Sequence, residues 1–292
     1  MKTVLGIFRA ACYSPGMAGC DEAILRAVIE HLEAASYVVH LIHEEDFTAD
    51  TPMPDVVLHM ARSPHTLDIL QSWQEAGCHI INSVESIRRV ERAALAELCA
   101  IQSIPTPKTW IVSTVDCPPE NIIYPCWVKR TGSCAQEAND VCRADNTEEY
   151  TRSMANLHNR GIHKAVVMEH LEGQCIKFYA VGGTDFFYCF PAYDKWTVLK
   201  EKSVTNSSVS PAWKRAMAKL HYLIETAMSA FPPQSKGGRE KLQVYGGDAI
   251  IGSDGTARLI DLNDWPSFSA CRKEAAKAIA QSVMDKTGQK HA

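Results

Sequence analysis

Hydrophobic and polar positions follow two different periods along the first third of the chain. Runs of four or five mostly apolar residues, typical of buried strands, occur at 4–8, 38–42, 56–60 and 79–82. The segments 21–35 and 66–76 between them instead carry apolar residues at helical spacing. Strands that alternate with helices are typical of a parallel sheet with covering helices. We therefore expect a small doubly wound α/β unit in this part of the chain.

The pattern beyond this unit predicts a mixture of helices and strands. Helices are expected at 84–101, 148–160, 211–230 and 269–284. Pro105 and Pro107 force an extended segment after the first of these helices. Within residues 109–180 we expect two strands before the helix at 148–160 and a strand after it, and the polar segments 200–210 and 231–241 read as loops, the first of them mobile. With 292 residues, of which 46% are hydrophobic, the chain is long enough for several subdomains with cores of their own. We expect three units, at 1–83, 84–180 and 181–292.

A hairpin near the end of the chain carries the most informative chemistry. Two strand-like runs that begin at Gly246 and Leu259 flank an Asp-Gly turn. Asp248 lies in the first run, and Asp261 and Asn263 lie two residues apart in the second, so strand alternation points both side chains to one face. Two carboxylates and an amide oxygen suit a magnesium ion that completes its shell with water and phosphate oxygens. A hairpin with solvated acidic side chains is the alternative.

Six segments occur in the order of the motifs of the ATP-grasp superfamily, which the chain resembles over residues 80–284. The segments are Ile81–Ser83 with Arg92, Ser103–Thr109, Pro125–Lys129, Val166–Gly173, Ile176–Gly182 and the hairpin. The resemblance implies an α/β protein with an ATP-grasp fold of two lobes behind a small doubly wound pre-ATP-grasp domain. It also implies ATP and Mg²⁺ as cofactors, with two ions expected and Mn²⁺ as an alternative metal.

The resemblance assigns roles to individual residues. Lys129 and Lys177 correspond to lysines that contact ATP phosphates, and both lie in apolar strands where an unpaired charge would be costly. A solvated surface position is the alternative for each. The residues that correspond to the hinge whose backbone meets adenine are Glu169, His170 and Leu171. The residues that correspond to the metal ligands are Asp248, Asp261 and Asn263.

Three further positions leave alternatives open. Arg92 corresponds to a basic helix residue of the superfamily that binds the nucleotide, yet with Arg88 and Arg89 it could equally form a solvated helix face. Residues 129–138 correspond to the glycine-rich flap over the phosphates, although they contain a single glycine. The Cys134 thiol in this flap is either a nucleophile or incidental.

The resemblance alone does not choose the reaction. Most members of the superfamily, including D-alanine ligases and glutathione synthetases, join a carboxylate to an amine through an acyl phosphate, and a smaller branch phosphorylates a hydroxyl group. Segments 176–182 and 260–266 look more similar to the inositol tris/tetrakisphosphate kinases than to many ligases. Gln136, Glu137 and Asp140 of the flap would instead repel a multiply phosphorylated sugar. We therefore expect a ligase that forms a C–N bond, with a small-molecule kinase as the alternative and a non-catalytic nucleotide-binding regulator as the third.

The remaining expectations concern catalysis, partners and compartment. Besides Lys177, the candidate catalytic residue is Arg272, which could grip a substrate carboxylate or lie solvated in the first turn of the last helix. A net charge of −4 argues against nucleic acid and anionic membranes as partners and leaves small molecules, a carboxylate and an amine or a polyol phosphate. A homodimer is compatible with the sequence. Eleven cysteines without CxxC spacing indicate reduced thiols, and we expect a cytoplasmic protein without a transmembrane segment.

Overall fold

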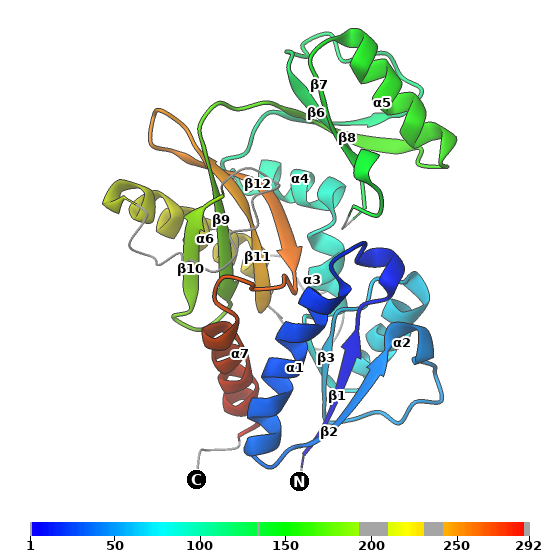
Figure 1. Cartoon of the computed structure of the whole chain (residues 1–292), viewed down its shortest axis with the longest axis vertical. Coiled ribbons are helices and arrows are strands. Elements are labelled where there is room, and N and C mark those ends of the chain that lie inside the picture. Colours follow the sequence, from blue (N-terminus) through cyan, green and yellow to red (C-terminus); the bar gives the residue numbers. More distant parts are fainter. Residues whose placement is uncertain (1, 133–134, 193–209, 231–241, 289–292) are drawn as a thin grey trace.

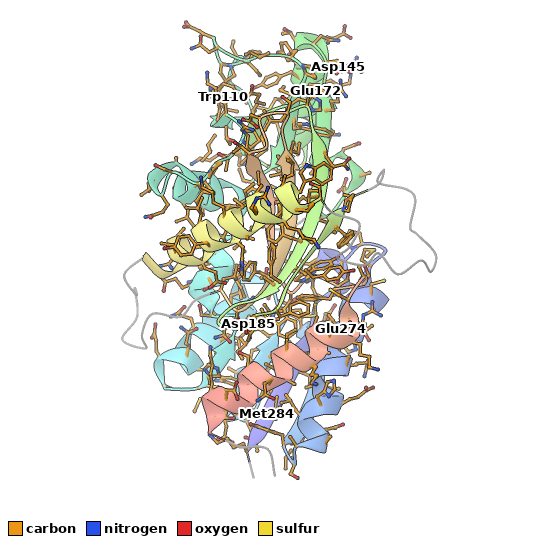
Figure 2. The ribbon with its side chains drawn as sticks, turned by 90° about the vertical axis from the view of Figure 1, so that its left-hand side faces the viewer. Trp110, Asp145, Glu172, Asp185, Glu274 and Met284 are labelled. Atoms are coloured by element: carbon orange, nitrogen blue, oxygen red, sulfur yellow. The ribbon has the colours of Figure 1, made fainter. Side chains whose placement is uncertain are left out.

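Three four-stranded sheets follow one another along the chain (Figure 1). The structure is a computed structural model that describes residues 2–132, 135–192, 210–230 and 242–288. In Figure 2, Trp110 and Asp145 lie toward one end of the molecule, where the second sheet is, and Met284 of the last helix lies toward the other end. The predicted loops at 200–210 and 231–241 lie almost entirely outside the described residues.

The first sheet is parallel, in the order β2-β1-β3-β4. Its elements are β1 (Thr3–Phe8), α1 (Ala18–Ala34), β2 (Val38–His43), β3 (Val56–His59), α2 (Pro64–Glu75) and β4 (His79–Ile81). Helix α2 begins after Ser63, whose hydroxyl accepts a hydrogen bond from the backbone N–H of Thr66, and Pro64 takes the first helical position. This unit is the doubly wound arrangement that the apolar pattern predicted.

The predicted helix at 84–101 is in fact two helices, α3 (Val84–Arg89) and α4 (Arg92–Ile101). The chain bends at Val90 and Glu91, and Glu91 has an extended backbone conformation. Val90 is nevertheless buried, as are Val84 and Ile87 of α3 and Leu95 and Leu98 of α4, so the apolar spacing continues across the break. The break makes Arg92 the first residue of α4.

The second sheet is antiparallel, in the order β5-β8-β6-β7. Its elements are β5 (Thr109–Ser113), β6 (Cys126–Arg130), β7 (Val141–Ala144), α5 (Thr147–Asn159) and β8 (Lys164–Glu169). Helix α5 packs on one face through a cluster that includes Val128, Tyr150 and Val167. The sequence analysis missed β7, because this four-residue strand has one buried residue and no apolar alternation.

The third sheet is antiparallel, in the order β10-β9-β11-β12. Its elements are β9 (Gln174–Val181), β10 (Phe187–Pro191), α6 (Pro211–Ala230), β11 (Val244–Ile251), β12 (Ala257–Asp264) and α7 (Arg272–Thr287). Strand β9, which we assigned to the first lobe, therefore hydrogen-bonds within the third sheet. Helix α6 packs on one face of this sheet. Helix α7 contributes to the core on the other face and lies beside α1.

The cysteines in the described part of the chain are all free thiols. Cys134 lies outside the described residues. Among the residues that the structure describes, no helix combines the length and apolar character needed to cross a membrane.

Candidate active site

A row of charged residues crosses three neighbouring strands of the third sheet. Asp248 on β11 is paired in register with Lys177 on β9 and with Asp261 on β12. Cross-strand partners project to the same face of a sheet. The Lys177 Nζ lies 2.8 Å from the Asp248 Oδ1. The face that carries this polar row is the one opposite α6, because the neighbouring residues Ile176 and Ala249 belong to the core under α6.

A β-bulge in β12 brings Asp261 into the polar row. The register shifts between Asp248 and Ala249, which pair with Asp261 and Leu259, so Ile260 is the extra residue. Simple alternation would place Leu259 and Asp261 on the same face, but Leu259 is buried in the core that includes α4 and α6, whereas Asp261 lies in register with Asp248 and, beyond it, Lys177. A bulge re-aims the side chains that follow it in this way.

Arg92 reaches the polar row from the first turn of α4. Its Nε lies 3.3 Å from the Asp261 Oδ2, and its Nη1 donates to the backbone carbonyl of Arg130 at 3.2 Å. The residue is 8% exposed, so the alternative of a solvated helix face is wrong. Arg92 thus connects helix α4, the end of β6 and the third sheet.

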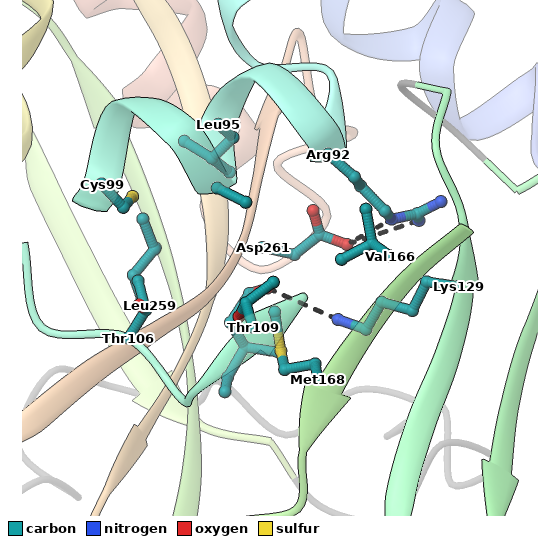
Figure 3. Close-up of a pocket in the computed structure, with 12 residues that line it drawn as sticks. Arg92, Leu95, Cys99, Thr106, Thr109, Lys129, Val166, Met168, Leu259 and Asp261 are labelled. Carbon is teal, nitrogen blue, oxygen red and sulfur yellow. Dashed lines mark hydrogen bonds and ion pairs between the residues drawn. The ribbon is translucent and has the colours of Figure 1, made fainter. Parts of the chain in front are cut away.

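Lys129 approaches the same place from the second sheet. It is paired in register with Val166, on the face of the sheet opposite α5. Its Nζ donates to the backbone carbonyl of Ile260 at 3.4 Å, and the residue is 5% exposed. A solvated surface position is therefore excluded for Lys129. Two cations from different elements, Arg92 and Lys129, lie beside Asp261 in Figure 3.

A pocket lies between the second sheet, α4 and β12. Apolar and weakly polar side chains form most of its wall, and Arg92, Lys129 and Asp261 form its charged end (Figure 3). The other lining residues include Leu95, Cys99, Thr109, Val166, Met168 and Leu259. The chemistry of this lining therefore suits an apolar ring that carries an anionic group at one end.

The charges of the polar row stabilise one another. Burial alone would lower the pKa of Lys177, but the charge of Asp248 and its hydrogen bond outweigh this effect and raise the pKa. Lys177 is thus a partly exposed lysine in an ion pair, with 36% of its side chain accessible.

The donor set of the hairpin fits a magnesium ion. Asp248 and Asp261 are neighbours in register, and Asn263, opposite Gly246, lies on the same face one row away. No group of three or more His, Cys, Asp or Glu that could hold a metal occurs among the described residues. Two carboxylates and an amide are nevertheless suitable for magnesium, which keeps water and phosphate oxygens in its shell. Such an ion would have to compete with Lys177 and Arg92 for the two carboxylates.

The predicted hinge follows directly from β8. The backbone N–H of Glu169 donates to the Lys108 carbonyl at 2.9 Å, and that of His170 donates to the Pro125 carbonyl at 3.3 Å. These two N–H groups are therefore engaged within the chain, which leaves Leu171 as the candidate N–H donor to an adenine ring. The His170 imidazole accepts a hydrogen bond from the Trp127 indole at 3.1 Å.

Asp140 of the flap is not placed to repel an anionic substrate. It is fully buried and lies 2.8 Å from the Arg160 guanidinium at the end of α5. Burial would raise its pKa, but backbone N–H groups of Gln136 and Glu137 and the charge of Arg160 together lower it. Glu137 lies 3.2 Å from the same guanidinium but is 62% exposed, so its charge can still face an anionic substrate. Cys134 lies outside the described residues.

The structure does not connect Arg272 to the polar row. Arg272 is the first residue of α7, and its Nε donates to the carbonyl of Ser267 at 3.5 Å. No ion pair of this guanidinium occurs within the described part of the chain.

The sequence analysis missed a buried ion pair that joins the first and third sheets. Arg62, just beyond β3, lies 2.6 Å from Asp264 at the end of β12, and both side chains are at most 5% exposed. Asn82 adds a second connection, since its Oδ1 accepts hydrogen bonds at 2.8 Å from the N–H groups of Gln243 and Val244. The available signal for Arg62 was its charge directly after the buried segment 56–61.

Known structures resemble this fold along its whole length. D-alanine–D-alanine ligase from Bacillus anthracis, complexed with ATP, has a TM-score of 0.68 at 11% identity and covers 99% of this chain and 100% of its own. A RimK domain ATP-grasp protein from Sphaerobacter thermophilus has a TM-score of 0.65 at 14% identity, with 96% and 99% covered. N5-carboxyaminoimidazole ribonucleotide synthetase from Thermotoga maritima has a TM-score of 0.59 at 11% identity, with 90% and 68% covered.

Sequence comparison alone identifies no relative, because no family model and no curated protein matches the chain. At identities this low, the structural likenesses establish the fold and not the reaction. They confirm the fold class that the motifs predicted.

Proposed function

We propose that this chain, whose fold is ATP-grasp, is a magnesium- and ATP-dependent ligase that joins a carboxylate to an amine. The observation that carries the proposal is the meeting of three cations and two carboxylates: Arg92 pairs with Asp261, Lys177 pairs with Asp248, and Lys129 donates to the backbone carbonyl of Ile260 beside Asp261. These five residues come from α4, β6, β9, β11 and β12, and three of them, Arg92, Lys129 and Asp261, line one largely apolar pocket. Charged side chains in such a place are costly unless they are paired and hydrogen-bonded, so their accumulation here supports a binding site for a charged ligand.

The arrangement supports each part of nucleotide binding. The apolar walls of the pocket, Val166, Met168 and Leu259 among them, suit an adenine ring. Lys129 and Arg92 lie at the charged end, where they can offset the charge of a triphosphate. Magnesium at the carboxylates would further neutralise the phosphates.

The proposed reaction has two steps. A substrate carboxylate oxygen attacks the γ-phosphorus of ATP, the bond to ADP breaks, and an acyl phosphate forms. A neutral amine then attacks the acyl carbon, orthophosphate leaves, and the nitrogen loses a proton. Lys177 is exposed enough to contact the transferring phosphoryl group and is our candidate for stabilising its charge. Arg272 stays our candidate for the substrate carboxylate.

The structural neighbours favour a ligase over a kinase in this proposal. The Bacillus anthracis protein, which is a D-alanine–D-alanine ligase, matches this chain over nearly all of both chains at 11% identity. The Thermotoga maritima synthetase supports the same reaction class.

A small-molecule kinase is the second candidate. The burial of Asp140 and its ion pair with Arg160 weaken the electrostatic argument against a phosphorylated acceptor.

One experiment separates these functions. The protein is incubated with Mg²⁺, ATP and pooled amino acids, small carboxylates and polyol phosphates, while ADP release and ³¹P resonances are followed. Orthophosphate that requires both a carboxylate and an amine supports the ligase, and a new phosphate ester without orthophosphate supports the kinase. Asp261→Asn should abolish turnover, while Asp254→Asn, at an exposed position in the hairpin turn, should not. Wild-type activity of Asp261→Asn would refute the site.

A further inference from the structure

The polar row continues into an aromatic surface on the edge strand of the third sheet. Strand β10 pairs with β9 so that Phe190 lies in register with Lys177, and Tyr188 lies in register with Tyr179. Phe190 is therefore the fourth member of the row that contains Asp248 and Asp261. Its backbone is about one strand spacing, or ~4.8 Å, from that of Lys177.

The aromatic side chains form one continuous surface. The ring of Phe190 lies 5.9 Å from that of Tyr179 and 5.7 Å from that of Tyr188. Tyr179 is buried and packs on Phe268 at 5.0 Å, which anchors the group in the core under α7. Tyr188 and Phe190 are only partly buried. The two rings therefore keep accessible area beside the polar row.

The two faces of β10 pack on different helices. On one face, the partly buried Phe187 stacks on His221 of α6 at 4.5 Å and 12°, and Cys189 is buried. On the face of the polar row, Tyr188 and Phe190 pack against the core that includes α7 and keep part of their surface accessible. Strand β10 is an edge strand of this sheet (Figure 1), and edge strands commonly carry charged residues instead.

We propose that Tyr188 and Phe190 bind the side chain of the acceptor substrate, and that this side chain is aromatic or large and apolar. The inference rests on the proposed function, because that function places the reacting carboxylate near Lys177. A substituent one or two bonds from this carboxylate reaches the next strand, where Phe190 lies. A methyl group would cover little of this surface, whereas an aromatic ring buries about 150–250 Å². The two rings carry no positive charge for a multiply phosphorylated sugar.

The test combines binding with turnover. Saturation-transfer NMR measures contact of phenylalanine, leucine and alanine with the protein in the presence of Mg²⁺ and a non-hydrolysable ATP analogue. Steady-state assays then compare the same amino acids as acceptors, each with a pool of amines. We expect phenylalanine and leucine to exceed alanine in kcat/KM by about tenfold or more, which corresponds to about 1.4 kcal/mol.

The variants decide whether the aromatic surface is responsible. Phe190→Ala should raise the KM for phenylalanine about tenfold while kcat and the KM for ATP change little. Phe190→Leu should recover part of the loss. Tyr222→Ala, which removes an aromatic ring with 69% exposure on α6, is the control and should change nothing. Unchanged selectivity in Phe190→Ala, or a preference for alanine, would overturn the proposal.

The two proposals can fail separately. If no carboxylate supports turnover, the ligase function fails, and the NMR measurement still decides the binding site. Ring contact of phenylalanine that Phe190→Ala abolishes supports the site, and contact that this variant leaves intact overturns it.

Discussion

Arg92 pairs with Asp261, and its removal should change metal affinity and nucleotide affinity in opposite directions. The guanidinium lies 3.3 Å and 3.4 Å, through Nε and Nη2, from one oxygen of Asp261. It also donates to the carbonyls of Arg130 and Gly132. A divalent ion that binds without ATP has to displace this cation. When a triphosphate arrives with the metal, Arg92 can move to the phosphates while Asp261 accepts the ion.

The magnitude follows from burial. The side chains of Arg92 and Asp261 are 8% and 16% exposed, so the pair lies between an exposed pair and a fully buried one. Its net strength is then about 1–2 kcal/mol. Without this competition, Arg92→Ala should bind Mn²⁺ alone about 5–30 times more tightly. The same variant loses a charged phosphate contact, worth about 1.5–3 kcal/mol, and should bind an ATP analogue about 10–100 times more weakly.

Two titrations measure these affinities. Free Mn²⁺ is followed by electron paramagnetic resonance without nucleotide, and binding of a non-hydrolysable ATP analogue is followed by calorimetry. Arg88→Ala is the matched control, because Arg88 is 48% exposed and pairs with the exposed Asp68. Equal or weaker Mn²⁺ binding by Arg92→Ala would refute the competition. An unchanged affinity for the ATP analogue would refute the phosphate contact.

Three further predictions concern stability and binding. Asp264→Ala leaves Arg62 charged and buried without its partner, so urea unfolding should show a loss of about 3–5 kcal/mol, against less than about 0.5 kcal/mol for the exposed Asp68→Ala. Burial lowers the pKa of His59 to about 4, so its contribution to stability is present above about pH 6.5 and is lost as the pH falls toward 4. Between pH 6.5 and 4, the free energy of unfolding should therefore fall by up to about 3 kcal/mol more in the wild type than in His59→Gln. Plots of this free energy against pH that run parallel for the two proteins would contradict the prediction. Lys129→Met should weaken binding of an ATP analogue by about 10–100-fold in calorimetry with unchanged circular dichroism, and unchanged affinity would refute its role.

Local sequence was sufficient to predict the fold class. Apolar runs of strand length and helical spacing are properties of neighbouring residues, so the doubly wound unit and most helices could be read directly. The charged residues that interrupt apolar strands, Lys129 and Lys177, were visible for the same reason. The order of short motifs then indicated ATP-grasp, although no family model recognises the chain.

Local reasoning failed where the backbone departs from regular geometry. The break between α3 and α4 is invisible in the apolar pattern, because residues on both sides of it are buried. The bulge at Ile260 is equally invisible, since one extra residue changes the face of every residue that follows it. Asp261 would otherwise share the face of Leu259, so the alignment of the polar row depends on this one residue.

Pairing between distant residues was decided by the tertiary structure alone. Arg92 meets Asp261 across 169 positions of the sequence, and Arg62 meets Asp264 across 202. The sequence establishes that these residues carry charge, but strand register and the packing of the sheets determine which charges meet. The same holds for Asp140, which its burial and its ion pair with Arg160 remove from our electrostatic argument. Residue type and local period therefore determined the class of protein and its candidate residues. Long-range pairing decided their partners, because the energy of a charge depends on its neighbours in space.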